Sequence, residues 1–199
     1  VNGLGVIYTS AYSACSKYIN LFMQPAATAG LAMSSFTSQN YGAKRYDRIR
    51  EGLHVCLSIA LIAYVVLGSV MFFFPRALAL LMLNGEESIA LVVEFLPICG
   101  LMIWGVDSLF VFRNGCQGMG KPLIPMISGV AEMIMRIAAI VLLVNVVGFR
   151  ATAYAEVAAW LVALAMNFTA FEYHLRKEMK YIEIPEATGK KYHYKLRRG

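Results

Sequence analysis

Five long apolar segments dominate this sequence, and each is about as long as the roughly 20 residues that a helix needs to cross a membrane. They are residues 6–38, 53–74, 89–112, 122–147 and 151–173. The hydrophobic fraction is 59%, against roughly 45–50% in soluble domains, and the mean hydropathy is +0.60. Because lipid offers no hydrogen-bond partners to an open backbone, we predict an all-α fold: a polytopic transmembrane helix bundle with about five spans.

Lysine and arginine gather on one side of the predicted membrane. Four lie within residues 44–50 after the first span, Arg113 and Lys121 follow the third span, and eight lie near the C-terminus. The loops on the opposite side carry only Arg76 and Arg150. Because cytoplasmic loops are enriched in positive charge, we predict a cytoplasmic C-terminus and an external N-terminus, which fits an odd number of crossings.

The charge distribution also divides the chain into two parts. Residues 1–175 form the predicted membrane lobe, and residues 176–199 form a basic cytoplasmic tail, which we expect to be unstructured and attracted to the anionic lipid bilayer. A nucleic-acid partner is not expected, because the basic residues do not cover one folded soluble face. The chain opens at Val1 without an initiator methionine, so we expect a piece of a longer protein.

The sequence lacks the motifs of enzymes and cofactor sites. Its four cysteines are scattered without a CxxC pair. The glycine-rich residues 115–121 lack the GxxxxGK[ST] spacing of a phosphate loop and are better interpreted as a tight turn between two helices. We therefore predict no enzyme activity, no cofactor and no metal cluster.

A polar stripe runs along the first span at helical spacing. Its members are Ser10, Ser13, Lys17, Asn20 and Gln24. A polar stripe facing lipid would be costly, so we expect it to face other helices or to line a water-filled substrate pathway. For Lys17 an alternative is that its long side chain reaches outward to the membrane interface.

The third span carries a second set of residues on one helical face. They are Gly100, Trp104, Asp107, Val111 and Asn114. Asp107 is the carboxylate nearest the middle of a span, where an ionisable group costs about 2.5–3.5 kcal/mol to insert. We therefore predict ion coupling at Asp107 and Asn114, with Na⁺ as a candidate ligand of Asp107, and we assign Trp104 to the substrate pathway. The alternative is a carboxylate hydrogen-bonded permanently to a neighbouring helix.

Glu132 and Arg136 stand four residues apart in the fourth span. This spacing places both side chains on one helical face, where they can form an ion pair. Because pairing makes two buried charges tolerable, we interpret this pair as structural.

Several motifs together resemble a known family. Residues 39–50, QNYGAKRYDRIR, are similar to a QN-x-GA-x-x-x-x-R loop, and Pro25 with small residues after it precedes this loop. Residues 113–120 are similar to an RxGxQGxG turn, and the Glu132-Arg136 spacing and Trp160 also fit. Over residues 1–175 the chain resembles the C-terminal half of a bacterial multidrug and toxic compound extrusion (MATE) transporter.

The resemblance implies a transporter of twelve helices in two six-helix lobes. This chain would supply helices eight to twelve and would need the missing N-terminal lobe as a partner. The expected activity is export of cationic or amphipathic organic compounds, such as drugs, in exchange for Na⁺ or H⁺ across a bacterial plasma (inner) membrane. Asp107 falls near an acid that some members use for ion coupling.

Two other functions fit parts of the sequence. A flippase for lipid-linked saccharides, from the same superfamily, would be expected to carry more cationic residues along its cavity than Lys17 and Arg136. A non-transporting membrane scaffold could use the basic tail to bind partners.

Overall fold

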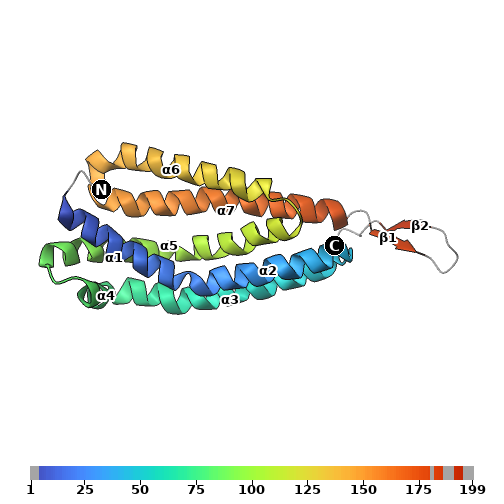
Figure 1. The fold of residues 1–199 in the computed structure, drawn as a ribbon, viewed down its shortest axis with the longest axis horizontal. Helices are drawn as coiled ribbons and strands as arrows, with labels where there is room; N and C mark the ends of the chain where they lie inside the picture. Colours follow the sequence, from blue (N-terminus) through green and yellow to red (C-terminus); the bar gives the residue numbers. More distant parts are fainter. Residues whose placement is uncertain (1–4, 180–181, 186–190, 195–199) are drawn as a thin grey trace.

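A computed structural model describes residues 5–179, 182–185 and 191–194 of the chain. Over these residues, seven helices form an elongated bundle, and the all-α prediction is confirmed (Figure 1). The helices are α1 (Val6–Phe22), α2 (Gln24–Gly42), α3 (Tyr46–Phe73), α4 (Pro75–Met82), α5 (Glu86–Gly118), α6 (Leu123–Val147) and α7 (Arg150–Met179). Four of them, α3, α5, α6 and α7, are long and apolar enough to cross a membrane.

The first predicted span is two helices rather than one. α1 ends at Phe22 and α2 begins at Gln24, with Met23 between them. Pro25 supplies no backbone N–H and its ring crowds the preceding turn, which disfavours a continuous helix here and suits the first turn of α2, where Pro25 lies. α1 and α2 lie end to end along the length of the bundle and together occupy the place of the first predicted crossing (Figure 1).

Other helices extend beyond the predicted spans. α3 begins at Tyr46 rather than at residue 53, and α7 continues to Met179 rather than ending at residue 173. α5 runs to Gly118, so the placement of Arg113 in a loop was wrong. Arg113 forms an ion pair with Glu132 of the neighbouring α6, and this pairing offsets part of the free-energy cost of a charge within a span.

α5 is the central helix, and all the other helices contact it. Small residues let the backbones approach closely, as is common where helices pack in lipid. A Cβ atom at Gly100 of α5 would lie 2.8 Å from Cβ of Met71 and 3.0 Å from the carbonyl oxygen of Gly68, both on α3. At Gly30 of α2, a Cβ atom would lie 2.8 Å from the carbonyl oxygen of Phe110 on α5. These glycines fix the distance of α2 and α3 from the central helix.

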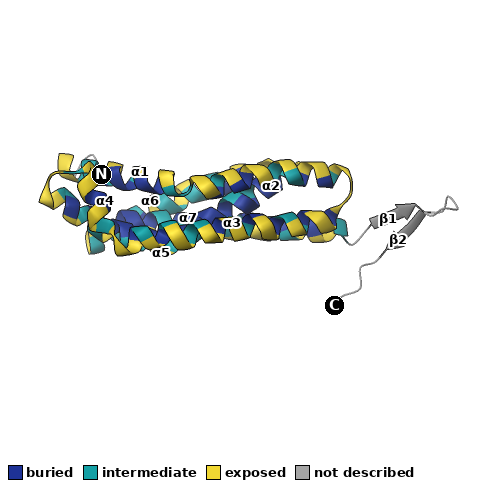
Figure 2. Ribbon diagram, turned by 90° about the horizontal axis from the view of Figure 1, so that it is seen from below, coloured by how far each residue is buried: buried dark blue, intermediate teal, exposed yellow. Residues whose placement is uncertain are grey.

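The buried side chains form two cores along the bundle. One core joins α1, α4, α5, the end of α3 and the first part of α7, and the other joins α2, the first part of α3 and the later turns of α5 and α7. Figure 2 shows the buried residues on the inner faces and exposed residues outside. Exposed apolar side chains cover the outer face of α6, among them Val130, Ile134 and Val141. In a membrane protein such a face is suited to contact lipid.

The tail contains regular structure that the sequence analysis did not predict. β1 (Ile182–Pro185) pairs antiparallel with β2 (Lys191–Tyr194), with Ile182 opposite Tyr194. The expectation of an unstructured tail is therefore wrong for these two segments, whose isoleucine and tyrosine residues favour strands. Several basic tail residues, among them Lys180 and Lys190, lie outside the described residues.

The close contact between α3 and α5 can be tested with Gly100→Val. Extra atoms forced into a tight contact cost about 1–3 kcal/mol, so the free energy of unfolding in detergent micelles should fall by about that amount. Gly129→Val on α6 is the matched control, because a Cβ atom there meets no other group within 4 Å. Equal effects of the two substitutions would contradict the close approach of α3 and α5.

Candidate functional site

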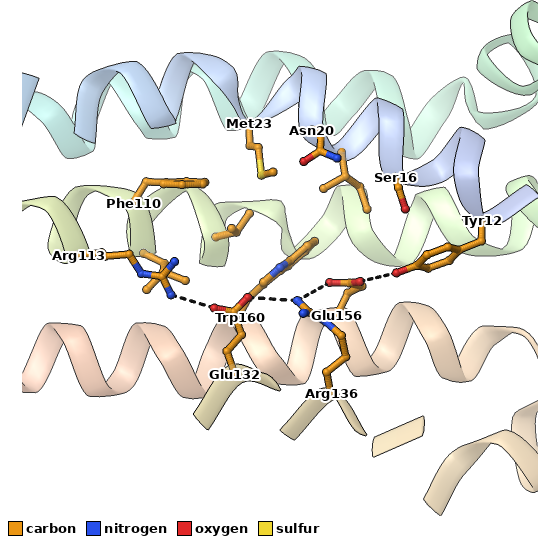
Figure 3. Close-up of a pocket in the computed structure, with 13 residues that line it drawn as sticks. Tyr12, Ser16, Asn20, Met23, Phe110, Arg113, Glu132, Arg136, Glu156 and Trp160 are labelled. Atoms are coloured by element: carbon orange, nitrogen blue, oxygen red, sulfur yellow. Dashed lines mark hydrogen bonds and ion pairs between the residues drawn. The ribbon is translucent and has the colours of Figure 1, made fainter. Parts of the chain in front are cut away.

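A polar cavity of about 290 Å³ lies between α1, α5, α6 and α7. It is lined by Tyr12, Ser16, Ile19, Asn20, Met23, Val106, Leu109, Phe110, Arg113, Glu132, Arg136, Glu156 and Trp160. Charged, aromatic and apolar side chains therefore share one space (Figure 3). Because Met23 is one of the lining residues, the break between α1 and α2 borders this cavity.

A chain of ion pairs and one hydrogen bond crosses the cavity wall (Figure 3). Nη2 of Arg113 lies 2.8 Å from Oε2 of Glu132, and Nη2 of Arg136 lies 3.1 Å from Oε1 of the same glutamate. Nη2 of Arg136 also lies 2.9 Å from Oε2 of Glu156. The Tyr12 hydroxyl donates a hydrogen bond to Oε1 of Glu156 at 2.9 Å. We call these five residues the charge network; it connects α5, α6, α7 and α1.

The charge network is neutral and largely shielded from solvent. Its two arginines and two glutamates have side chains between 15% and 33% exposed. Removing such charges from water costs several kcal/mol per ion, and pairing with good geometry offsets this cost. The predicted Glu132–Arg136 ion pair is confirmed, but it is the middle of a longer network rather than an isolated pair.

Asp107 lies on α5 outside the cavity. It follows the cavity-lining residue Val106, and it is only 2% exposed. Its Oδ1 atom is buried and has no hydrogen-bond partner among the described residues. An unpaired buried carboxylate oxygen is costly, so this position is suited to a proton or a cation.

Asn114 lies two helical turns further along the same face of α5. Its side-chain Nδ2 donates to the carbonyl oxygen of Phe110 at 2.8 Å and lies next to Gly30 of α2. Gly100, two turns before Asp107, packs against α3. Asp107 thus shares a face of α5 with Gly100, which contacts α3, and with Asn114, which contacts α2. The cavity is lined by the neighbouring face of α5, which includes Val106.

The other predicted pathway residues lie in different places. Asn20 is the one member of the first-span stripe that lines the polar cavity. Ser13, Lys17 and Gln24 are exposed on this chain, and Ser10 is partly buried. Trp104 lines a second, mainly apolar cavity of about 500 Å³ formed by α3, α5 and α7. The structure therefore does not bring the stripe and Trp104 together.

Sequence reasoning missed most of the charge network. Arg113 was assigned to a loop, Glu156 was not linked to Arg136, and Tyr12 carried no signal of its own. The spacing of Glu156 and Trp160, four residues apart on α7, could have indicated a shared face toward the cavity. No group of three or more His, Cys, Asp or Glu side chains suited to a metal ion occurs among the described residues.

Comparison with known proteins decides the family. The family model described as MatE matches residues 1–147, which is well over half of the chain. The chain belongs to the MATE family. It is thus a multi-pass membrane protein of a transporter family, not an enzyme.

One curated protein and several solved structures are similar to this chain over part of their own length. The chain is 28% identical over 98 residues to "Probable multidrug resistance protein YoeA" of Bacillus subtilis (strain 168), which covers 49% of this chain and 21% of that protein. An inward-facing multidrug resistance MATE family transporter matches 85% of this chain and 39% of its own, with a TM-score of 0.76 and 20% identity. MATE in complex with MaD5 matches 96% of this chain and 43% of its own, with a TM-score of 0.74 and 20% identity.

The matched MATE structures are longer than this chain. The chain spans less than half the length of the MATE structures that it matches. At 20% identity or less, those structures establish the helical fold of this part.

Glu132→Gln tests the energetic role of the charge network. Loss of this carboxylate leaves Arg113 and Arg136 without their shared partner, and breaking a buried ion pair costs about 3–5 kcal/mol. Because these side chains are 17–33% exposed, the free energy of unfolding in detergent should fall by more than the roughly 1 kcal/mol of an exposed pair and by at most about 3–5 kcal/mol. Glu86→Gln is the matched control because the Arg76–Glu86 pair is 66% and 75% exposed, and exposed pairs contribute at most about 1 kcal/mol. An effect no larger than that of the control would show that the network does not stabilise the lobe.

Proposed function

We propose that the chain is most of one lobe of a secondary active antiporter that exports cationic or amphipathic organic compounds, such as drugs, in exchange for Na⁺ or H⁺. The observation that carries this proposal is the buried Asp107 carboxylate on the central helix, with an oxygen that has no partner in the described chain. MATE family membership supports it independently. A second lobe of the same transporter would complete the pathway.

Asp107 would alternate between a loaded and an empty form. A buried carboxylate is stabilised when it accepts a proton or binds a cation, and it is costly when it has neither. α5 touches the other helices of the bundle, so a change in the charge of Asp107 acts on the helix that anchors the bundle. This arrangement would couple ion occupancy to helix packing.

Asn114 would act at a different point of the ion pathway. Seven residues along an α-helix correspond to about 10 Å, so one ion cannot contact Asp107 and Asn114 together. The Asn114 amide nitrogen is engaged with Phe110, which leaves its amide oxygen as the group for a passing cation. We assign Asn114 to entry or exit of the ion rather than to the same site.

The substrate pathway would run beside α1. Asn20 lines the polar cavity. The other stripe residues lie along α1 and at the start of α2: Ser10, Ser13, Lys17 and Gln24. We propose that the exposed part of the stripe borders the space between this lobe and the second lobe. Trp104 would offer an aromatic surface in the apolar cavity.

The lipid-linked saccharide flippase is the second candidate. Arg113 and Arg136 both line the cavity. Arg136 was expected there from the sequence, and Arg113 is an additional cation. Glu132 and Glu156 neutralise these arginines, however, and so remove the excess positive charge that anionic lipid carriers would need. The antiporter is therefore the function we propose.

We also propose a location in a bacterial plasma membrane with the basic end of the bundle in the cytoplasm. The short segments before α3 and before α6 lie at the same end of the bundle as the end of α7 (Figure 1). They carry Lys44, Arg45 and Lys121, so the positive charge of the loops is concentrated at this end.

Single cysteines at the two ends test this orientation. The four native cysteines are buried, so introduced cysteines at exposed Ala43 and Asn84 give a clear signal. A membrane-impermeant maleimide should label Asn84→Cys in intact cells and Ala43→Cys only after the membrane is permeabilised. The reverse pattern would refute the proposed orientation.

Asp107→Asn tests ion coupling. In proteoliposomes of the complete transporter, efflux of ethidium driven by an imposed Na⁺ or H⁺ gradient should fall at least about tenfold, because the amide cannot be ionised. Membrane insertion should be unchanged. Glu94→Gln is the control: Glu94 lies on the same helix but is exposed and pairs with Arg150 at the helix end. Undiminished efflux by Asp107→Asn would rule out its coupling role.

A further inference from the structure

We propose that the groove between α3 and α7 binds an anionic phospholipid, with the phosphate at Arg50 and Arg176 and one acyl chain in the apolar cavity beside Trp104. The site goes beyond the proposed antiporter function, because it depends only on the location of the bundle in a membrane. It follows from the shape of the groove, from the order of charged and apolar side chains along it, and from the charge at one end.

Two cavities follow one another along the space between α3 and α7. The apolar cavity of about 500 Å³ is formed by α3, α5 and α7. A smaller cavity of about 220 Å³, which we call the basic cavity, lies between the first turns of α3 and the last turns of α7. Phe168 lines both, so the two cavities adjoin. Together they form what we call the lipid groove.

The lipid groove changes from charged to apolar along both of its outer walls. On α3, Arg50 and His54 line the basic cavity, whereas Leu57 and Leu61 line the apolar cavity. These positions are three or four residues apart, so their side chains lie on one face of the helix. The lining residues of α7 change in the same way: Arg176, Glu172, Phe168 and Leu161. A phospholipid has the same order, with a charged headgroup followed by apolar chains.

The length of the groove fits one acyl chain. From Arg50 to Leu61 the helix rises by about 16–17 Å, and the hydrocarbon core of one leaflet is about 15 Å thick. Arg50 lies one turn after the start of α3 and Arg176 one turn before the end of α7, at the same end of the bundle (Figure 1). Both arginines are thus suited to headgroup depth. Trp104 lines the apolar cavity, so an amphipathic compound that reached it from the bilayer would have to displace the acyl chain.

The basic cavity carries more positive than negative charge. Nη2 of Arg50 lies 3.2 Å from Oε2 of Glu172, and Nε of Arg176 lies 2.7 Å from the same oxygen. Two guanidinium groups therefore share one carboxylate, which gives these three residues a net charge of +1. Glu172 is 17% exposed, whereas Arg50 and Arg176 are 39% and 72% exposed and remain accessible to a ligand.

This excess charge favours an anionic headgroup. The planar donors of arginine match the oxygens of a phosphate, and basic pockets between transmembrane helices bind anionic lipid headgroups. A phosphatidylglycerol headgroup brings one negative charge and neutralises the basic cavity. A phosphatidylcholine headgroup brings its own cation and does not. The groove should therefore prefer phosphatidylglycerol.

The groove faces lipid rather than the second lobe. Ser108 lines the apolar cavity and lies two residues from both Val106 and Phe110, which line the polar cavity. Two residues correspond to about 200° around an α-helix, so the two cavities lie on opposite faces of α5. The polar cavity is the one bordered by α1, which we assign to the side of the second lobe. Leu61 and Phe168 are 47% and 46% exposed, so the groove is open along the outside of the bundle.

Trp104 provides an optical signal for the acyl chain, because bromine atoms on a lipid chain quench tryptophan fluorescence on contact. The complete purified transporter is reconstituted in phosphatidylcholine vesicles that contain a small fraction of brominated phosphatidylglycerol or of brominated phosphatidylcholine. The quenching that disappears in Trp104→Phe is the part due to the groove. It should reach its midpoint at an about fivefold lower fraction of brominated phosphatidylglycerol than of brominated phosphatidylcholine. Trp160→Phe is the matched control, because Trp160 lines the polar cavity, and it should leave this preference unchanged.

Two charge variants test the cause of the preference. Arg50→Gln removes one guanidinium group and leaves Arg176 paired with Glu172, so the preference should fall to about twofold or less. Arg76→Gln, in the exposed pair at the other end of the bundle, should leave it unchanged. Equal quenching of Trp104 by the two lipids in the unaltered protein, or an unchanged preference in Arg50→Gln, would overturn the anionic site.

A third variant tests the position of the acyl chain. Ala165 is exposed and lines the apolar cavity, so Ala165→Phe should fill the cavity and reduce the quenching of Trp104 by both lipids. Thr169→Phe adds the same ring at an exposed position of α7 that lines neither cavity of the groove, and it should have no such effect. If brominated lipid did not quench Trp104 in the unaltered protein, another part of the transporter rather than lipid would cover the groove, and the proposal would fail.

Discussion

Close packing around α5 is the constraint on which the rest of the structure depends. Lipid is as apolar as leucine, so helices in a membrane associate mainly through shape and polar contacts rather than through the hydrophobic effect. Gly30, Gly68 and Gly100 let α2 and α3 reach the central helix at distances that a side chain would prevent. The position of α5 in turn places Asp107 on the face that packs against α2 and α3, and it places Arg113 in the cavity wall. One helix therefore carries both the candidate ion site and part of the candidate substrate site.

The charge network solves a second problem that follows from this arrangement. A cavity lined with polar groups is useful in a transporter, but isolated charges within the membrane are costly. The network distributes two positive and two negative side chains over three helices, and Tyr12 adds a hydrogen bond from a fourth. The network therefore places charged groups in the cavity wall, and because its net charge is zero, the free-energy cost of burying them is limited.

Sequence patterns predicted the parts of the fold that depend on local composition. Apolar length located the crossings, and the break between α1 and α2 lies next to Pro25, whose effect on the backbone is local. The helical continuation through Arg113 was not predictable in this way, since it depends on Glu132 from another helix. The same holds for Tyr12 and Glu156, which are 144 residues apart in the sequence. Spacing placed the polar stripe on one face of a helix, but the neighbouring helices decided that only Asn20 would reach the cavity.

The break at Met23 also divides the first helix pair between two cores. α1 contributes its buried side chains to the core shared with α4, whereas α2 contributes to the core shared with α3. The cavity-lining residues Tyr12, Ser16 and Asn20 all belong to α1, and the glycine contact with the central helix at Gly30 belongs to α2. Substitutions at these α1 positions therefore change the cavity wall and leave the close contact of α2 with the central helix in place. The break at Met23 thus separates the helix that lines the cavity from the helix whose glycine sets its distance to α5.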